Sequence, residues 1–163
     1  MDTSATYYEK LPKKRMAVGI LFFNAAEELL IVKPTYKDTW SVPGGVVDEN
    51  ESLRDACIRE VREELGFTKK EVRLLCVDYM SPETSEYRGK TENLQFIFYG
   101  GVLTIREIEK ISLSKEELGD YAFVTIKEAV SLFNKNLARR IPKCIEALKK
   151  NTAYYLEGGE APK

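Results

Sequence analysis

Residues 59–67 read REVREELGF and raise a question about charge. In a helix, Glu60, Glu63 and Glu64 share one face, because residues three and four apart are neighbours there. Like charges at these spacings repel each other. Gly66 indicates a left-handed helix end, so the last two acids also lie at the negative end of the helix dipole. Both effects lower the stability of the helix, and a reason for the cluster has to be sought elsewhere.

Length and composition predict one globular domain. The chain has 163 residues, of which 44% are hydrophobic and 31% charged, which suits a single core. We expect this domain to cover residues 1–150 and residues 151–163 to form a frayed tail. The apolar runs at 16–24 and 96–103 are far below the roughly 18 residues that span a bilayer, and the charged N-terminus lacks a secretory signal. A cytoplasmic protein with no membrane contact is therefore expected.

The charge balance and two residue counts exclude several classes of function. Lys and Arg number 25 against 26 Asp and Glu, so no basic surface for a long nucleic acid is expected. The three cysteines form no CxxC pair, which argues for buried reduced thiols rather than a zinc knuckle or a disulfide framework. The chain has no histidine, which excludes Ser-His-Asp and Cys-His catalysis and histidine-containing metal sites. Carboxylates, lysines, tyrosines or a hard metal ion must carry any chemistry.

Hydrophobic patterning predicts a mixed sheet sandwiched by helices, an α/β fold. Apolar runs of strand-forming residues predict strands at residues 16–23, 28–32, 72–80, 93–104 and 121–125. Helices are expected at residues 52–65, 127–133 and 137–149. Ser52 with Asp55 resembles a capping box, and Pro142 indicates a kink or a boundary in the last helix. Gly100 and Gly101 indicate a bulge or bend, and residues 40–47 an extended segment broken at Pro-Gly-Gly.

The acidic face of the first helix has two interpretations. By composition alone, a solvated helix with Arg–Glu pairs is the more common one. Alternatively, Glu60, Glu63 and Glu64 hold a divalent cation, which turns their repulsion into coordination. All-oxygen ligands suit Mg²⁺, with Mn²⁺ as an option, and the Gly44-Gly45 turn lies close enough in sequence to add a carbonyl ligand. Such a site neutralises phosphate oxygens and orients a water for attack on phosphorus.

The spacing around this helix resembles a known motif. The chain has Gly45, then Glu51 after five intervening residues, and then residues 59–67 after seven more. This pattern is similar to the Nudix box, G-x5-E-x7-R-E-U-x-E-E-x-G-U with U apolar, at all nine specified positions. The preceding WSVPGG at 40–45 also looks like the family's usual lead-in. The resemblance implies an α/β/α sandwich with a mixed β-sheet over roughly residues 12–150.

The resemblance implies metal ligands and catalytic groups inside the box. Glu60, Glu63 and Glu64 are expected to bind the metal and carry the reaction, with the Gly44 carbonyl as a further ligand. Glu51 is expected to be an auxiliary or outer-shell acid of the metal site.

Two further groups complete the expected catalytic set. Arg59 is expected to orient the glutamates through hydrogen bonds. Family members often take a base or ligand from a loop outside the box, and Glu116 or Glu117 are the candidates here, with Glu117 taken as the catalytic one. An exposed charged loop is an equally good interpretation of these two acids.

The resemblance specifies the type of reaction but not the substrate. Nudix enzymes generally hydrolyse a nucleoside diphosphate linked to a moiety X, so a small nucleotide is the expected partner. Lys33, Tyr36 and Arg88 are candidates for substrate binding. Pro82, 15 residues after Phe67, resembles a mark of ADP-ribose-cleaving members and slightly favours ADP-ribose or a nucleotide sugar. A nucleoside triphosphate, a dinucleoside polyphosphate and a capped RNA end stay open.

Two other questions stay open as well. A non-catalytic nucleotide sensor on the same fold is the alternative function. A homodimer is compatible with the sequence, which carries no specific sign of an interface.

Overall fold

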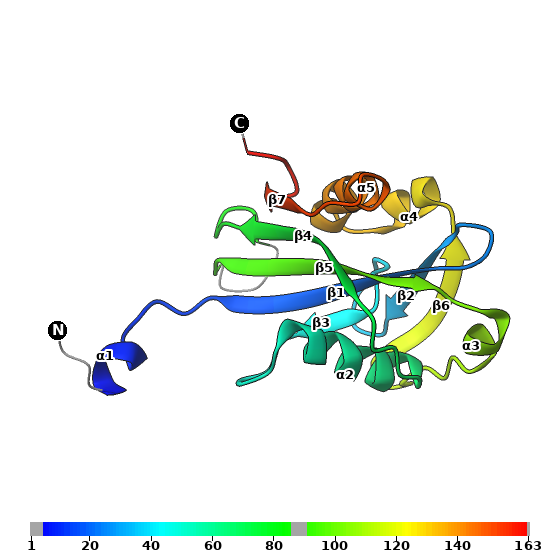
Figure 1. Ribbon diagram of the computed structural model, residues 1–163, viewed down its shortest axis with the longest axis horizontal. Coiled ribbons are helices and arrows are strands. Elements are labelled where there is room, and N and C mark those ends of the chain that lie inside the picture. Colours follow the sequence, from blue (N-terminus) through cyan, green and yellow to red (C-terminus); the bar gives the residue numbers. More distant parts are fainter. Residues whose placement is uncertain (1–4, 86–90, 163) are drawn as a thin grey trace.

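A seven-stranded mixed sheet forms the centre of the computed structural model (Figure 1), which describes residues 5–85 and 91–162. The strands are β1 (Arg15–Phe23), β2 (Leu29–Pro34), β3 (Gly44–Val46), β4 (Arg73–Met80), β5 (Asn93–Val102), β6 (Leu118–Val124) and β7 (Tyr154–Glu157). The helices are α1 (Ala5–Glu9), α2 (Leu53–Leu65), α3 (Ile105–Glu109), α4 (Ile126–Leu132) and α5 (Lys135–Lys149). The strand order is β6-β2-β1-β5-β4-β7, and β3 pairs with β1. The predicted α/β fold with a mixed sheet is confirmed.

The strand pairing explains a pair of glycines in β5. Strands β1 and β5 run parallel, and their register shifts so that Leu21 lies opposite Tyr99 and Phe22 opposite Gly101. Gly100 is the extra residue of this bulge. A Cβ added at Gly100 lies 2.2 Å from a ring carbon of Phe22, so only glycine leaves room for that ring. The predicted bulge is confirmed.

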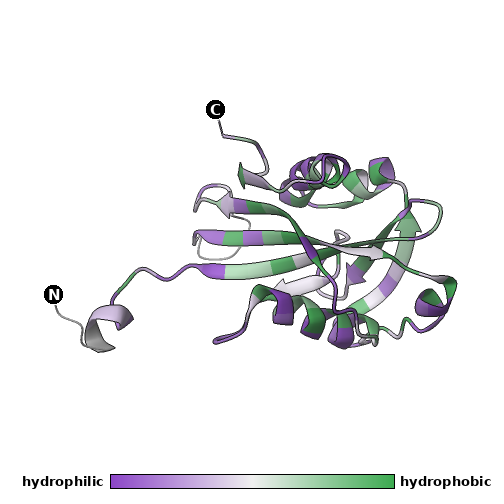
Figure 2. Ribbon diagram, viewed as in Figure 1, coloured by the Kyte–Doolittle hydropathy of each residue, from purple (hydrophilic) through white to green (hydrophobic). Residues whose placement is uncertain are grey.

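Helices cover both faces of the sheet. Helix α2 lies on one side and α4 and α5 on the other (Figure 1). Because successive strand residues point to opposite faces, Ile20 and Phe22 of β1 pack in the core beneath α2, whereas Leu21 and Phe23 pack in the core beneath α4 and α5. Figure 2 shows hydrophobic and hydrophilic residues alternating along α2 and α5, as expected for helices that bury one face.

Helix α2 begins and ends close to where the sequence predicted. Ser52 is the N-cap, and its hydroxyl oxygen accepts the backbone N–H of Asp55 at 3.1 Å. The Asp55 carboxylate accepts the Ser52 hydroxyl at 2.8 Å rather than the Ser52 backbone, so only half of a capping box forms. Gly66 adopts φ 78° and donates its N–H to the Arg62 carbonyl, which confirms the predicted left-handed helix end.

The C-terminal segment corrects one prediction. Residues 151–163 were expected to be frayed, but residues 154–157 form β7, which pairs in parallel with β4. Leu156 is fully buried in the core beneath α5. Backbone pairing with an otherwise open sheet edge and one buried leucine together hold this segment in place.

Two helices also differ from the prediction. Pro142 lies inside α5, which continues to Lys149, so the proline is not a helix boundary. The charged stretch at 106–120 carries α3, which the hydrophobic pattern did not indicate. Its start is fixed by a full capping box between Thr104 and Glu107, a local hydrogen-bonding signal that does not depend on amphipathicity.

The three cysteines are buried free thiols, as predicted. The Cys144 thiol of α5 donates to the Cys76 sulfur of β4 at 3.2 Å, and this contact together with burial raises the pKa of Cys144. Within the part of the chain that the structure describes, no helix combines the length and apolar character needed to cross a membrane.

Candidate active site

Four carboxylates that come from two parts of the chain surround one small pocket. Glu60, Glu63 and Glu64 extend from α2, and Glu117 reaches the same pocket from the turn that precedes β6. The pocket has a volume of about 250 Å³. Its remaining lining residues are Tyr36, Gly44, Gly45, Arg59 and Leu118. The structure therefore brings the predicted base candidate together with the three predicted metal ligands.

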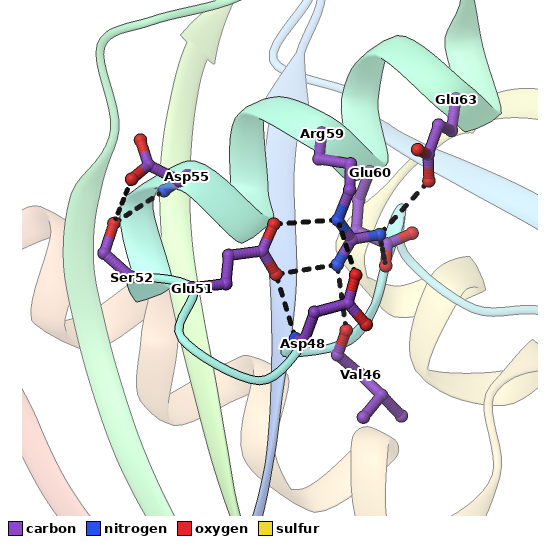
Figure 3. Close-up of polar contacts among 8 residues, drawn as sticks. All are labelled: Val46, Asp48, Glu51, Ser52, Asp55, Arg59, Glu60 and Glu63. Atoms are coloured by element: carbon purple, nitrogen blue, oxygen red, sulfur yellow. Dashed lines mark hydrogen bonds and ion pairs between the residues drawn. The ribbon is translucent and has the colours of Figure 1, made fainter.

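Arg59 holds the acids of the box in a network of ion pairs (Figure 3). Its Nη1 donates to Glu60 Oε1 at 2.8 Å and to Glu63 Oε2 at 3.1 Å. On the other side, Nε and Nη2 donate to the two carboxylate oxygens of Glu51 at 2.8 and 2.9 Å, and Nη2 also donates to the Val46 carbonyl at 3.0 Å. Glu51 thus fixes the guanidinium, and the guanidinium fixes two of the pocket acids.

Glu51 takes part in the site through Arg59 rather than directly. Its carboxylate also accepts the Asp48 backbone N–H at 3.0 Å, and the hydrogen bond from Arg59, followed by that from Asp48, lowers its pKa to about 2. Glu51 is not among the residues that line the acidic pocket. The outer-shell role expected of Glu51 in a metal site stays a prediction, and in this arrangement it would act through Arg59.

Glu64 is the most perturbed acid of the pocket. Its exposed fraction is 7%, and its Oε2 accepts the Gly44 backbone N–H at 2.8 Å. Burial raises its pKa to about 8, and the charges of Glu60, Glu117 and Glu63 act in the same direction. Burial also raises the pKa of Glu60. Without a cation, Glu64 is therefore largely protonated at neutral pH.

The donor set fits a hard divalent cation in its chemistry, since every ligand atom available is an oxygen. Among the described residues, however, no group of three or more acidic or cysteine side chains is arranged as a ready metal site. Arg59 occupies oxygens of Glu60 and Glu63, and the Gly44 N–H occupies one of Glu64. A bound cation would exchange these contacts for its own. The carbonyl-ligand role expected of Gly44 stays a prediction.

Gly45 leaves the space that the Glu60 carboxylate fills. A Cβ added there lies 2.3 Å from Glu60 Oε1, so Gly45→Ala must push the carboxylate aside. We expect this change to weaken Mn²⁺ binding about 10- to 100-fold, measured by isothermal titration calorimetry. Gly119→Ala is the control, because its added Cβ meets its nearest atom, the Lys33 carbonyl oxygen, at 3.8 Å. Equal Mn²⁺ affinity of both variants would contradict the assignment of Glu60 as a ligand.

A larger cleft adjoins the acidic pocket. Its volume is about 870 Å³, within the usual range for ligand sites. The two cavities share Tyr36, Gly44, Gly45 and Glu64 in their lining. Besides these, the cleft is lined by apolar side chains, such as those of Val18, Val42 and Ile97, together with polar side chains that carry little net charge. The polar side chains include Lys37, Asp38, Asn93, Gln95, Asn134, Asn136 and Arg140.

The predicted substrate-binding residues fall in different places. Tyr36 lines both cavities, with an exposed fraction of 72%. The Lys33 ammonium donates to the Lys37 carbonyl at 2.7 Å, and Lys33 is absent from the described lining of both cavities, whereas Lys37 lines the cleft. Arg88 lies outside the described residues. Arg140 also lines the cleft and was not predicted as a site residue, although a charged residue on the apolar face of a helix was an available signal.

Comparison with known proteins relates the chain to one family. The model of the NUDIX domain family matches residues 13–148. The chain is 43% identical over 61 residues to an RNA pyrophosphohydrolase of Actinobacillus pleuropneumoniae. These 61 residues make up 37% of this chain and 30% of that protein. It is 37% identical over 68 residues to the m7GpppN-mRNA hydrolase of Saccharomyces cerevisiae, 41% of this chain and 7% of that protein. The matches therefore span less than a third of the length of these two relatives.

Solved structures share the fold across a larger share of the chain. A MutT protein from Methanosarcina mazei superposes with a TM-score of 0.66 at 21% identity, over 87% of this chain and 99% of that one. A UDP-X diphosphatase superposes with a TM-score of 0.68 at 21% identity, over 95% and 70% of the two chains. The family model matches most of the chain, and the glutamates of α2 meet Glu117 at one pocket, so this chain belongs to the Nudix family.

Proposed function

We propose that this protein is a divalent-metal-dependent pyrophosphohydrolase that acts on a nucleoside diphosphate linked to a moiety X. The observation that carries the proposal is the acidic pocket, in which Glu60, Glu63, Glu64 and Glu117 meet at the edge of a nucleotide-sized cleft. Membership of the Nudix family supports it, since enzymes of that family generally use divalent metals.

The proposed chemistry assigns a role to each of these groups. Glu60, Glu63 and Glu64 hold the cation, with Mg²⁺ as the expected ion and Mn²⁺ as a substitute. When bound, the cation neutralises phosphate charge and lowers the pKa of water. Glu117 accepts the proton of the water that attacks phosphorus, while the bond from that phosphorus to the bridging oxygen breaks.

Arg59 has a positioning role in this scheme. Its bidentate contact with Glu51 keeps the guanidinium in place. From that position it restricts the rotamers of Glu60 and Glu63, so the ligands are oriented before substrate arrives.

The size of the cleft limits which groups the moiety X can be, whereas the Nudix box does not specify X. A volume of about 870 Å³ holds a nucleotide with an attached group, in keeping with ADP-ribose, a nucleotide sugar or a nucleoside triphosphate. The relatives named as acting on RNA keep a triphosphorylated or capped RNA end as an alternative. The net charge of −1 argues against a long RNA partner, and a cytoplasmic location remains a prediction.

The sensor alternative is disfavoured by the box itself. A protein that binds a nucleotide without cleaving it has no need of a complete set of metal ligands, yet all nine specified positions of the box are present. Tight binding of a nucleotide together with no turnover of the same compound would favour the sensor.

The test is phosphate release, coupled to a phosphatase, from ADP-ribose, nucleotide sugars, nucleoside triphosphates and dinucleoside polyphosphates. We expect one class to be cleaved with Mg²⁺ and none with EDTA, and we expect Glu63→Gln to lose the activity. Cleavage that persists in EDTA or in Glu63→Gln would overturn the proposed mechanism. Folded, Mg²⁺-loaded protein that cleaves nothing on the panel would count against the function.

A further inference from the structure

A buried ion pair lies in the wall of the cleft, outside the acidic pocket. Arg140 of α5 donates through Nε to Asp78 Oδ2 of β4 at 2.7 Å. Asp78 is fully buried, and Arg140 has an exposed fraction of 5%. The other oxygen of Asp78 accepts the Gly159 backbone N–H at 3.0 Å. Residues from the helix, the strand and the segment after β7 thus hold one guanidinium in a fixed position.

The guanidinium keeps donors that the protein does not use. Its five N–H groups have two acceptors among the described residues: Asp78 for Nε and the Met80 sulfur for Nη2, the latter at 3.4 Å. The N–H groups of Nη1 and the second one of Nη2 make no further hydrogen bond within the described part of the chain. Because Arg140 lines the cleft, these donors form an outer edge that can meet a ligand there.

Charge favours a neutral ligand group at this edge. Asp78 already neutralises the guanidinium in a buried environment, so a phosphate placed there would put two anions beside one cation. A carbonyl or ring-nitrogen acceptor adds no charge and still satisfies the remaining N–H groups. The phosphates of a substrate have a different place, at the Glu64 end of the cleft, where a cation can balance them.

The neighbouring side chains are also neutral. Gln95 lies opposite Asp78, and Asn93 lies opposite Met80, in the pairing of β5 with β4, so all four side chains share one face of the sheet. Gln95 Nε2 donates to Asn93 Oδ1 at 2.6 Å, and both amides line the cleft. Amide groups beside a guanidinium that Asp78 holds in place can form hydrogen bonds with the edge of a nucleobase.

We propose that Arg140 determines base specificity and selects a 6-oxopurine, guanine above all, through the O6 and N7 acceptors of that base. This inference rests on the proposed function, because it places the base of the same substrate. The planar fork of arginine matches two adjacent acceptors. Adenine presents an amino donor where guanine has O6, and pyrimidines lack the imidazole nitrogen. Asp78 acts on the base only through Arg140 and is a positioning residue.

The first test leaves the protein unchanged and removes one acceptor from the ligand. Binding of GMP, 7-deaza-GMP and AMP is measured by calorimetry in EDTA. Hydrolysis of matched pairs, GTP against ATP and GDP-glucose against ADP-glucose, is measured with Mg²⁺. We expect GMP to bind about 10-fold more tightly than either of the other two, and the guanine member of a hydrolysed pair to have the higher kcat/KM by a similar factor.

Variants then connect the preference to the residue. Arg140→Met is expected to bind GMP, 7-deaza-GMP and AMP equally, whereas Arg139→Met, which changes an exposed arginine outside the described cleft lining, keeps the preference. Because Arg140→Met leaves Asp78 buried and unpaired, the double variant Asp78→Leu/Arg140→Met is made as well. It removes both charges and is expected to lose the preference in the same way.

The outcomes separate this inference from the proposed function. Hydrolysis with equal kcat/KM for guanine and adenine substrates, or equal binding of GMP and AMP, overturns the role of Arg140 and leaves the function standing. Guanine-selective binding without hydrolysis of any compound keeps the inference and sinks the function. Absence of both overturns both.

Discussion

Glu64→Gln lowers kcat/KM for Mg²⁺-dependent hydrolysis by about a thousandfold, which corresponds to roughly 4 kcal/mol of transition-state stabilisation. The amide can still accept the Gly44 N–H that the carboxylate accepts at 2.8 Å, so the position of the side chain is preserved. What the change removes is the negative charge that a divalent cation needs. We therefore expect a large loss of activity with little change in the fold.

The same variant is expected to be more stable than the wild-type protein when no metal is present. Glu64 lies among Glu60, Glu63 and Glu117 around one pocket, and at alkaline pH its charge is buried among three others. Removing that charge removes the repulsion. A urea titration in EDTA at pH 8 measures the gain, and a variant that is both inactive and less stable would indicate misfolding rather than loss of a ligand.

Glu49→Gln is the matched control. Glu49 lies two residues before Glu51, and it is exposed and outside the described lining of both cavities. We expect this variant to keep wild-type kcat/KM and wild-type stability. A thousandfold loss there would show that the assay responds to net charge and not to the pocket.

The sequence was a good guide where the chemistry is local. The capping residue Ser52, the glycine that ends α2 and the spacing of the three glutamates all act within a few turns of one helix. Local patterns of this kind are set by backbone geometry and helix periodicity, which can be read from the order of residues. Helix α2 and the three acids that it brings to the pocket were therefore predicted together.

Contacts between distant segments could not be predicted in this way. Glu117 reaches the acidic pocket because β6 pairs with β2, which also brings the Glu117 carbonyl to the Thr35 backbone N–H at 2.9 Å. The sequence named both Glu116 and Glu117 as candidates, and although Glu117 was taken as the catalytic one, nothing local separates two adjacent acids. The structure separates them, because Glu117 lines the pocket and Glu116 is absent from the described lining.

The buried pair of Asp78 and Arg140 was missed for a related reason. The two residues are separated by 62 positions, and each stands alone within an apolar pattern. A single charge in a strand or on the apolar face of a helix indicates that a partner is needed. It does not indicate which residue of opposite charge supplies it, and that depends on how α5 crosses β4.

The metal-free protein is expected to lose stability as the pH rises from about 4.5 to about 8, the ordinary and the folded-state pKa of Glu64. In this window the folded state keeps the Glu64 proton and the unfolded state has released it, so the free energy of unfolding falls with increasing pH. The contribution of protonated Glu64 to the free energy of unfolding is fully present below pH 4.5 and is lost above pH 8. Its size is roughly 5 kcal/mol for a group with an exposed fraction of 7%.

Burial raises the pKa of Glu60 as well, so Glu60 acts in the same direction as Glu64, whereas the acids whose pKa is lowered act in a different pH window. The pKa of Glu51 and that of Glu107 are both lowered to about 2, so their stabilisation is present above pH 4.5 and is lost only in acid. Urea titrations in EDTA at pH 5, 6, 7, 8 and 9 therefore isolate the acidic pocket. Glu64→Gln should flatten the curve, and saturating Mg²⁺ should do the same for the wild-type protein by stabilising the charged form. A wild-type curve as flat as that of the variant would mean that the buried carboxylate is not the group that resists ionisation, and the case for a cation as its natural counter-charge would fall with it.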